Sequence, residues 1–291
     1  KYYTVGAYVQ GQLSFNRIQL LLALRQEFYR DVLDFRTPAE NIVRQEKLLP
    51  RLGLVYDITE DINVYGTYTE SFQPQTSSVL LNPDLGGPFD PLSASMWEVG
   101  SKSEWIHNRI SLNVALYNIE QNNILVNAND PQNPDQLEQR GQEVSKGIEV
   151  DIMGNILSNL SVTANYAYND TRITQSDNEE QIGRLKENAP HHQGGVWGKF
   201  TIDQGLLEGL GIGFGSNFIS ERVTFDTYTL GLKLPGYVVS DAAIYYKVDR
   251  FNISANFNNL FNKTHWTGGY SYTRLFPGAP RNYLLNVAYT F

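Results

Sequence analysis

Cysteine is absent from this 291-residue sequence, and methionine occurs only twice. The lack of cysteine excludes a disulfide framework and any metal site built from thiolates. The longest aliphatic run, residues 20–24, has five residues, whereas a membrane-spanning helix needs about 20. The formal net charge is −8 and basic residues form no cluster, so we expect no nucleic-acid partner.

Period-2 alternation of apolar and polar residues is what the sequence has in abundance. In the last segment, one face carries Tyr283, Leu285, Val287, Tyr289 and Phe291. The same alternation occurs at 110–116 and 160–168, where small or polar residues occupy the second face. The mean hydropathy of −0.35 does not exclude a membrane protein, because only alternate residues of a barrel strand face lipid.

The predicted connections between strands fall into two length classes. Short turns are expected near 16–17, 60–61, 107–108, 154–159, 204–208 and 249–250. Long polar loops are expected at 31–41, 74–91, 127–135, 175–186, 221–234 and 262–280. Short turns on one rim and long loops on the other are typical of outer-membrane barrels.

These connections predict about thirteen long antiparallel strands, the first over residues 2–15, and no closed barrel from these residues alone. Bacterial single-chain barrels have even strand numbers. Because thirteen is odd, we expect further strands upstream of Lys1. The predicted fold class is an all-β transmembrane outer-membrane barrel.

A family resemblance extends over nearly the whole chain. Its motifs are LPRLGLVY at 49–56, VYGTYTESFQP at 64–74, WEVGSK at 97–102, ALYNI at 115–119 with Asn123, SKGIE at 145–149, NYAYNDT at 165–171, PGY at 235–237 with Asp241, NNLFNK at 258–263 and PGAPR at 277–281. Their order and spacing resemble those of the TonB-dependent siderophore receptors.

That resemblance implies a 22-stranded barrel, of which residues 1–291 would be the C-terminal part. It also implies an N-terminal plug domain and a short energy-coupling segment, the TonB box, neither of which is visible in the sequence. A chain ending in an aromatic, as at Phe291, resembles the assembly signal of such barrels. The cysteine pair that some ferrichrome-binding members carry in the last long loop is missing.

Charged residues on the polar face are expected to point into the lumen, to pair across strands and to hold the plug. They are Arg25, Glu27, Arg51, Glu98, Lys102, Glu149, Asp151, Asp241 and Arg281. Paired carboxylates such as Glu149 and Asp151 can perform acid–base catalysis. No nucleophile accompanies them, so we expect no enzyme activity and no catalytic residues.

Histidine occurs at 107, 191, 192 and 265. His191 and His192 are neighbours on a strand and point to opposite faces, so no metal site is expected. The candidate ligand-binding residues lie near the outer rim or in the last long loop, and they are Tyr29, Tyr117, His265, Trp266, Tyr270, Tyr272 and Phe276. Aromatic rings at that rim suit a bulky iron chelate.

Outward-facing aromatic residues are expected to form the two girdles at the membrane interfaces. They are Trp97, Trp105, Tyr289 and Phe291. Outer-membrane lipid and lipopolysaccharide would surround them.

The hypothesis from the sequence is therefore a bacterial outer-membrane receptor for active uptake of a ferric siderophore, with no covalently bound cofactor. Its partners would be TonB with its inner-membrane motor, the plug and the remaining strands. Haem or cobalamin is the alternative cargo in this hypothesis. The rival is a passive porin-like or adhesive barrel.

Overall fold

The computed structural model describes residues 1–33, 36, 41–87, 89–128, 132–133, 135–176, 179–225 and 227–291. Its main element is a 13-stranded sheet with the order β1-β2-β3-β4-β5-β6-β7-β8-β9-β10-β13-β14-β17, in which β1 and β17 are the edges. The strands are β1 (Tyr2–Phe15), β2 (Ile18–Leu33), β3 (Asn41–Asp57), β4 (Ile62–Gln73), β5 (Leu92–Trp105), β6 (Ile110–Asn127), β7 (Leu137–Leu157), β8 (Leu160–Gln175), β9 (His192–Thr201), β10 (Leu210–Ile219), β13 (Tyr237–Val248), β14 (Phe251–Asn258) and β17 (Asn282–Tyr289). The expected thirteen antiparallel strands are confirmed.

The chain divides into two compact units, each described by itself. Unit 1 comprises residues 1–100, 116–146 and 171–184, and unit 2 comprises 101–115, 147–170 and 185–291. Strands β5 to β8 contribute residues to both units.

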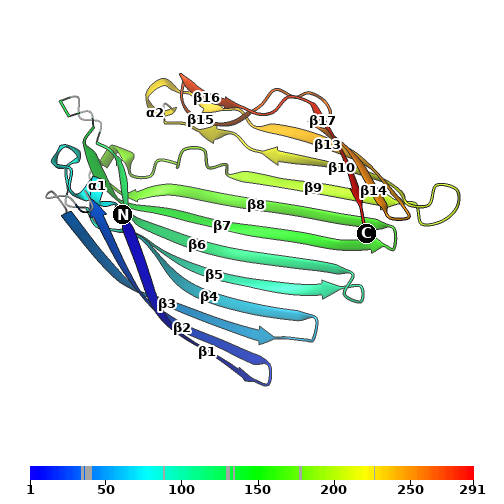
Figure 1. Cartoon of the computed structure of the whole chain (residues 1–291), viewed down its shortest axis with the longest axis horizontal. Helices are drawn as coiled ribbons and strands as arrows, with labels where there is room; N and C mark the ends of the chain where they lie inside the picture. The colour runs from blue at the N-terminus through cyan, green and yellow to red at the C-terminus, as the bar shows by residue number, and fades with distance from the viewer. Residues whose placement is uncertain are drawn as a thin grey trace. The chain divides into compact units, whose positions relative to one another are not determined.

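Short turns join the hairpins at one end of the strands. In unit 1, β1 and β2 run side by side and meet at Asn16 and Arg17 (Figure 1). Asn16 has φ 52° and Asp249, in the β13–β14 turn, has φ 49°. Asn and Asp tolerate this left-handed conformation better than most residues, which explains why the chain reverses there.

The turn predicted at 154–159 begins later than expected. Gly154 remains inside β7, which ends at Leu157. The Asn155 amide still donates to the Arg109 carbonyl at 2.8 Å, so the ladder continues past the glycine. The turn itself lies at residues 158–159, within the predicted range, and only its predicted start at Gly154 is wrong, because glycine also occurs in irregular strands.

The long connections contain short elements that the sequence did not predict. They are α1 (Ser77–Leu80), η1 (Pro83–Leu85), η2 (Glu179–Gln181), β11 (Arg222–Val223), α2 (Thr227–Leu230), β12 (Lys233–Leu234), β15 (Trp266–Ser271) and β16 (Arg274–Pro277). Within the described ranges, no helix has the length and apolar character needed to cross a membrane.

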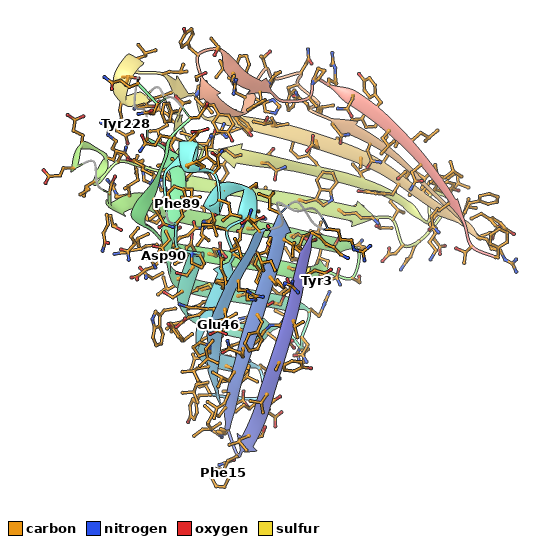
Figure 2. The ribbon with its side chains drawn as sticks, turned by 60° about the vertical axis from the view of Figure 1, so that its left-hand side comes forward. Tyr3, Phe15, Glu46, Phe89, Asp90 and Tyr228 are labelled. Carbon is orange, nitrogen blue, oxygen red and sulfur yellow. The ribbon has the colours of Figure 1, made fainter. Side chains whose placement is uncertain are left out.

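The sheet has an apolar face that nothing in the described chain covers. On β1, Val5, Val9 and Leu13 are each more than 60% exposed. The fully buried apolar side chains include Val32 in unit 1 and Leu234 in unit 2, which lie at the long-loop ends of the strands. Figure 2 shows Phe15 at the tip of the β1–β2 hairpin, at the other end of β1 from Tyr3.

Candidate ligand-binding site

The β15–β16 hairpin brings together most of the aromatic residues that the sequence singled out. Tyr270 and Phe276 make an edge-to-face contact with ring centroids 6.2 Å apart. Their side chains are 61% and 49% exposed, and Tyr272 at the tip is 68% exposed. Exposed rings on a short hairpin can stack on a ligand without first leaving a core.

Arg222 anchors this hairpin to the preceding long loop. Its side chain is only 4% exposed, and its two terminal nitrogens donate to the carbonyls of Thr267 at 2.9 Å and Trp266 at 2.6 Å. The guanidinium also lies 5.7 Å from the Tyr237 ring centroid. Burial lowers the pKa of Arg222 from its ordinary value, because a buried cation loses hydration that neutral carbonyls replace only in part.

Asn188 ties a third long loop to the same hairpin. Its side-chain oxygen accepts from the Gly269 amide and its side-chain nitrogen donates to the Gly269 carbonyl, both at 2.9 Å. The backbone amide of Asn188 donates to the Val223 carbonyl at 3.0 Å. In unit 2, hydrogen bonds therefore connect the loops around Asn188, Arg222 and Gly269.

The histidines have separate partners. The His265 ring contacts the Tyr237 ring at a tilt of 47°, with centroids 4.6 Å apart, and its Nδ1 lies 3.1 Å from the Lys263 carbonyl. The Nδ1 of His191 lies 2.9 Å from the Asn169 carbonyl, whereas that of His192 lies 2.8 Å from the Tyr166 hydroxyl. Among the described residues, no three His, Asp or Glu side chains are grouped to hold a metal ion.

The other two candidate aromatics, Tyr29 and Tyr117, belong to unit 1. Tyr29 on β2 stacks on Tyr2 of β1 with centroids 6.4 Å apart. Tyr117 lies on β6.

The 74–91 connection in unit 1 is fixed to the ends of the strands. Ser77, at the start of α1, donates from its amide and hydroxyl to one carboxylate oxygen of the buried Asp31, at 2.7 and 2.6 Å. The amide of Asp90 donates to Gln139 at 3.1 Å, and its carbonyl accepts from the same side chain at 2.6 Å. Figure 2 labels Asp90 beside Phe89, which is 9% exposed.

The charged residues of unit 1 pair locally. Arg25 and Glu27, two residues apart on β2, form an ion pair with an Nε–Oε2 distance of 2.6 Å. Glu98 accepts from the Tyr65 hydroxyl at 2.8 Å. Arg51 lies opposite Ala23 and Thr69 in the sheet register.

In unit 2, Glu149 and Asp151 line a cavity of about 370 Å³ together with Asn165, Gln193 and Asn217. Asp241 accepts from the Asn259 amide at 2.7 Å. Asp241 and the Glu149–Asp151 pair differ in whether their carboxylates are available to a ligand. Asp241 is committed to a turn, whereas Glu149 and Asp151 face a space that can hold a cationic group. Lys102 lies on β5. Arg281 precedes β17, and its backbone amide donates to the Asn262 side-chain oxygen at 3.0 Å.

The predicted girdle residues are exposed, and each contacts a neighbouring side chain. Trp97 is 58% exposed and contacts Tyr68, with centroids 4.5 Å apart. The Trp105 indole donates to the Ser103 hydroxyl at 2.9 Å. Tyr289 and Phe291 make an edge-to-face contact at 5.2 Å.

Trp197 is an aromatic residue of the polar face that the sequence reasoning missed. It lies opposite Gly215 and Thr163 in the register. A Cβ added at Gly213 would lie 2.5 Å from the Trp197 ring. Alternate glycines at 211, 213 and 215 were the available signal, because glycine in a strand often marks a close approach.

We expect Gly213→Leu to displace the Trp197 indole and to destabilise the fold by about 1–3 kcal/mol, as overpacking does. A shifted fluorescence emission of Trp197 and a lower midpoint of urea unfolding would show this. Val239→Leu, at a non-glycine position of the neighbouring strand, is the control and should leave the emission unchanged.

A family model described as TonB dependent receptor-like, beta-barrel, matches residues 1–260. The chain belongs to this family. It is therefore a multi-pass protein of the bacterial outer membrane. The family is one of receptors and not of enzymes.

Relatives of this receptor segment include the metal-pseudopaline receptor CntO of Pseudomonas aeruginosa (strain UCBPP-PA14), 27% identical over 97% of this chain and 40% of that protein. An uncharacterized TonB-dependent receptor of Haemophilus influenzae is 29% identical over 99% of this chain and 87% of that protein. The solved pyoverdine outer membrane receptor FpvA from Pseudomonas aeruginosa PAO1 has the same fold, with a TM-score of 0.81 at 22% identity, covering 100% of this chain and 42% of that one. The chain thus spans about two fifths of the CntO and FpvA sequences.

Proposed function

We propose that residues 1–291 are the C-terminal part of the barrel of a receptor for TonB-dependent uptake of a ferric siderophore. The observation that supports this best is the β15–β16 hairpin. It presents Tyr270, Tyr272 and Phe276 to solvent, and Arg222 holds its backbone in place. Relatives named for pseudopaline, pyoverdine and ferrioxamine B support a metal chelate as cargo.

In this proposal the chelate binds among the outer loops, with Trp266 and His265 of unit 2 as further contacts of the hairpin site. Tyr29 and Tyr117 are separate candidate contacts of unit 1. The lumen-facing charges contact a plug supplied by another part of the protein, and TonB with its inner-membrane motor moves that plug. Lipid and lipopolysaccharide surround the girdle residues. No residue performs covalent chemistry, and haem or cobalamin is the alternative cargo.

We expect the double change Tyr270→Ala and Phe276→Ala to weaken chelate binding about tenfold, since an aromatic contact contributes roughly 0.5–1.5 kcal/mol. Cells that carry the full-length receptor would be tested for binding and uptake of ⁵⁵Fe bound to pyoverdine, ferrioxamine B and pseudopaline. Phe261→Ala is the matched control, because Phe261 is 70% exposed and lies outside the hairpin.

A protonophore should abolish uptake while leaving binding intact, because the motor uses the energised inner membrane. Uptake that continues after the protonophore, or that rises linearly with chelate concentration, would instead indicate the passive porin. Equal binding by the hairpin variant and the control would remove the hairpin from the site.

A further inference from the structure

The apolar face of the sheet carries two arginines near the long-loop ends of β2 and β3 in unit 1. Tyr3 of β1 lies opposite Arg30 of β2, which lies opposite Arg44 of β3. Val9 and Leu24 form an exposed apolar pair on β1 and β2, six positions from Tyr3 and Arg30. An even separation keeps side chains on one face of a strand, so all three residues lie on the face that a barrel turns to lipid. We call Tyr3, Arg30 and Arg44 the arginine row.

The arginine row lies at the height of the lipid headgroups. Phe15, at the short-turn end of β1, is 81% exposed and suits an aromatic girdle. Tyr3 lies twelve positions away, toward the other end of the strand (Figure 2). At the usual rise of a strand and a tilt of 45°, this separation is about 28 Å along the membrane normal. The apolar band of such barrels is about 25 Å tall, so the row lies just beyond it.

A cavity of about 590 Å³ lies at the arginine row. Six of its eight lining residues belong to the apolar face, among them Phe28 and Glu46 in the next row of the register. The Arg30 Cζ lies 6.0 Å from the centroid of the Tyr3 ring, and the Lys1 Nζ lies 5.1 Å from it. Cation–π contacts of this kind hold positive charge beside the cavity.

The two arginines have no carboxylate partner among the residues that the structure describes. No ion pair within 4.0 Å joins Arg30 or Arg44 to an acidic side chain in those ranges. Glu46, the acidic residue of the described lining, is exposed and also forms no such pair. Like charges that face each other across two strands destabilise a sheet. An anion bound between the two guanidinium groups removes this repulsion.

A phosphate group carried by a lipid fits this place best. Guanidinium groups bind phosphate through paired, charged hydrogen bonds. Val5 and Phe28, which are 66% and 46% exposed in the row beneath, can contact the acyl chains of the same molecule. A free anion would leave these apolar side chains uncovered. The site therefore matches a molecule with a phosphate at the membrane surface and hydrocarbon below it.

We propose that the arginine row binds a phosphate of a lipopolysaccharide headgroup directly, without a bridging divalent cation. This rests on the proposed function, because it takes the long-loop ends of the strands as the cell-surface side. Carboxylates hold phosphates only through a metal ion, whereas guanidinium groups supply the positive charge themselves. One lipid molecule would thus be fixed against β1, β2 and β3.

Native mass spectrometry of the full-length receptor in detergent, titrated with diphosphoryl lipid A in EDTA, tests this. We expect the wild type to bind one more lipid A molecule than Arg30→Gln with Arg44→Gln. Affinity at the row should fall by about 10- to 100-fold in that variant, because charged hydrogen bonds to phosphate are lost. Arg17→Gln with Arg250→Gln is the matched control, since it removes the same charge from the short turns. This control should bind lipid A like the wild type, and heat-modifiable migration on gels verifies that both variants are folded.

Equal binding of lipid A by the wild type and the Arg30→Gln, Arg44→Gln variant overturns the proposal. Equal binding of lipid A without its phosphates also overturns it, because acyl chains alone would then explain the contact. Loss of wild-type binding in EDTA contradicts direct contact and indicates a metal bridge. Displacement of lipid A from the row by ferric pyoverdine or ferrioxamine B would assign the row to the chelate instead.

Uptake assays separate this result from the proposed function. Active uptake by a receptor whose arginine row binds no lipid A contradicts the lipid site alone. Binding of lipid A at the row of a receptor that takes up no chelate contradicts the proposed function alone.

Discussion

Val114→Arg is expected to destabilise the folded receptor by about 2–4 kcal/mol, the cost of a cation on the lipid face near the bilayer midplane. Val114 lies on β6 between Leu112 and Leu116, which share its face, and Leu116 is 55% exposed. A charge at that position has neither water nor a partner. Urea titration of the receptor in lipid vesicles, followed by heat-modifiable migration on gels, measures the loss.

The matched control is Asn113→Arg, one residue away on the polar face. Arginine at position 113 places the same charge at almost the same depth in the bilayer as arginine at position 114, so only the direction of the side chain differs. The control should cost well under half as much. Equal losses from the two variants would mean that β6 does not have one lipid face and one lumen face.

Arg222→Met is expected to release the β15–β16 hairpin while leaving the sheet intact. The change leaves the carbonyls of Trp266 and Thr267 without their donors, and each unsatisfied buried group costs about 1–3 kcal/mol. Amide exchange in residues 266–277 should then accelerate by about 10- to 100-fold. Hydrogen exchange read by mass spectrometry resolves this segment from β9 and β10.

Arg222→Lys separates the roles of charge and geometry in that hairpin. A lysine keeps the positive charge, yet its single ammonium group does not reproduce the fork that serves two carbonyls. We expect exchange in 266–277 to lie between wild type and Arg222→Met. Unchanged protection in both variants would show that the hairpin is held by other contacts, such as those of Asn188.

The strand pattern was predictable because each strand has one polar and one apolar face. The first strand was expected over residues 2–15, and β1 spans Tyr2–Phe15. Turn residues such as Asn16 fixed the boundary, since they adopt a positive φ at little cost. The predicted start of the turn after β7 was wrong at Gly154, because glycine is compatible with both a turn and an irregular strand.

The loop contacts were not predictable, because they join residues far apart in the sequence. The charge of Arg222 gave no sign that its partners would be carbonyls 44 and 45 residues later. The aromatic residues of 266–276 were selected by composition alone, and the hairpin that groups them is too short for periodicity to detect. Trp197 could have been found, since alternating glycines at 211, 213 and 215 leave room for a large neighbour.

The most direct test of the membrane-barrel account is the accessibility of single spin labels on alternate residues of the full-length receptor in lipid. The outward set should relax faster with lipid-soluble oxygen, and the lumen set with a water-soluble nickel chelate. The outward labels replace Leu112, Val114, Leu285 and Val287, and the lumen labels replace Ser111, Asn113 and Asn286. Equal access of both relaxants at the two sets would contradict the account.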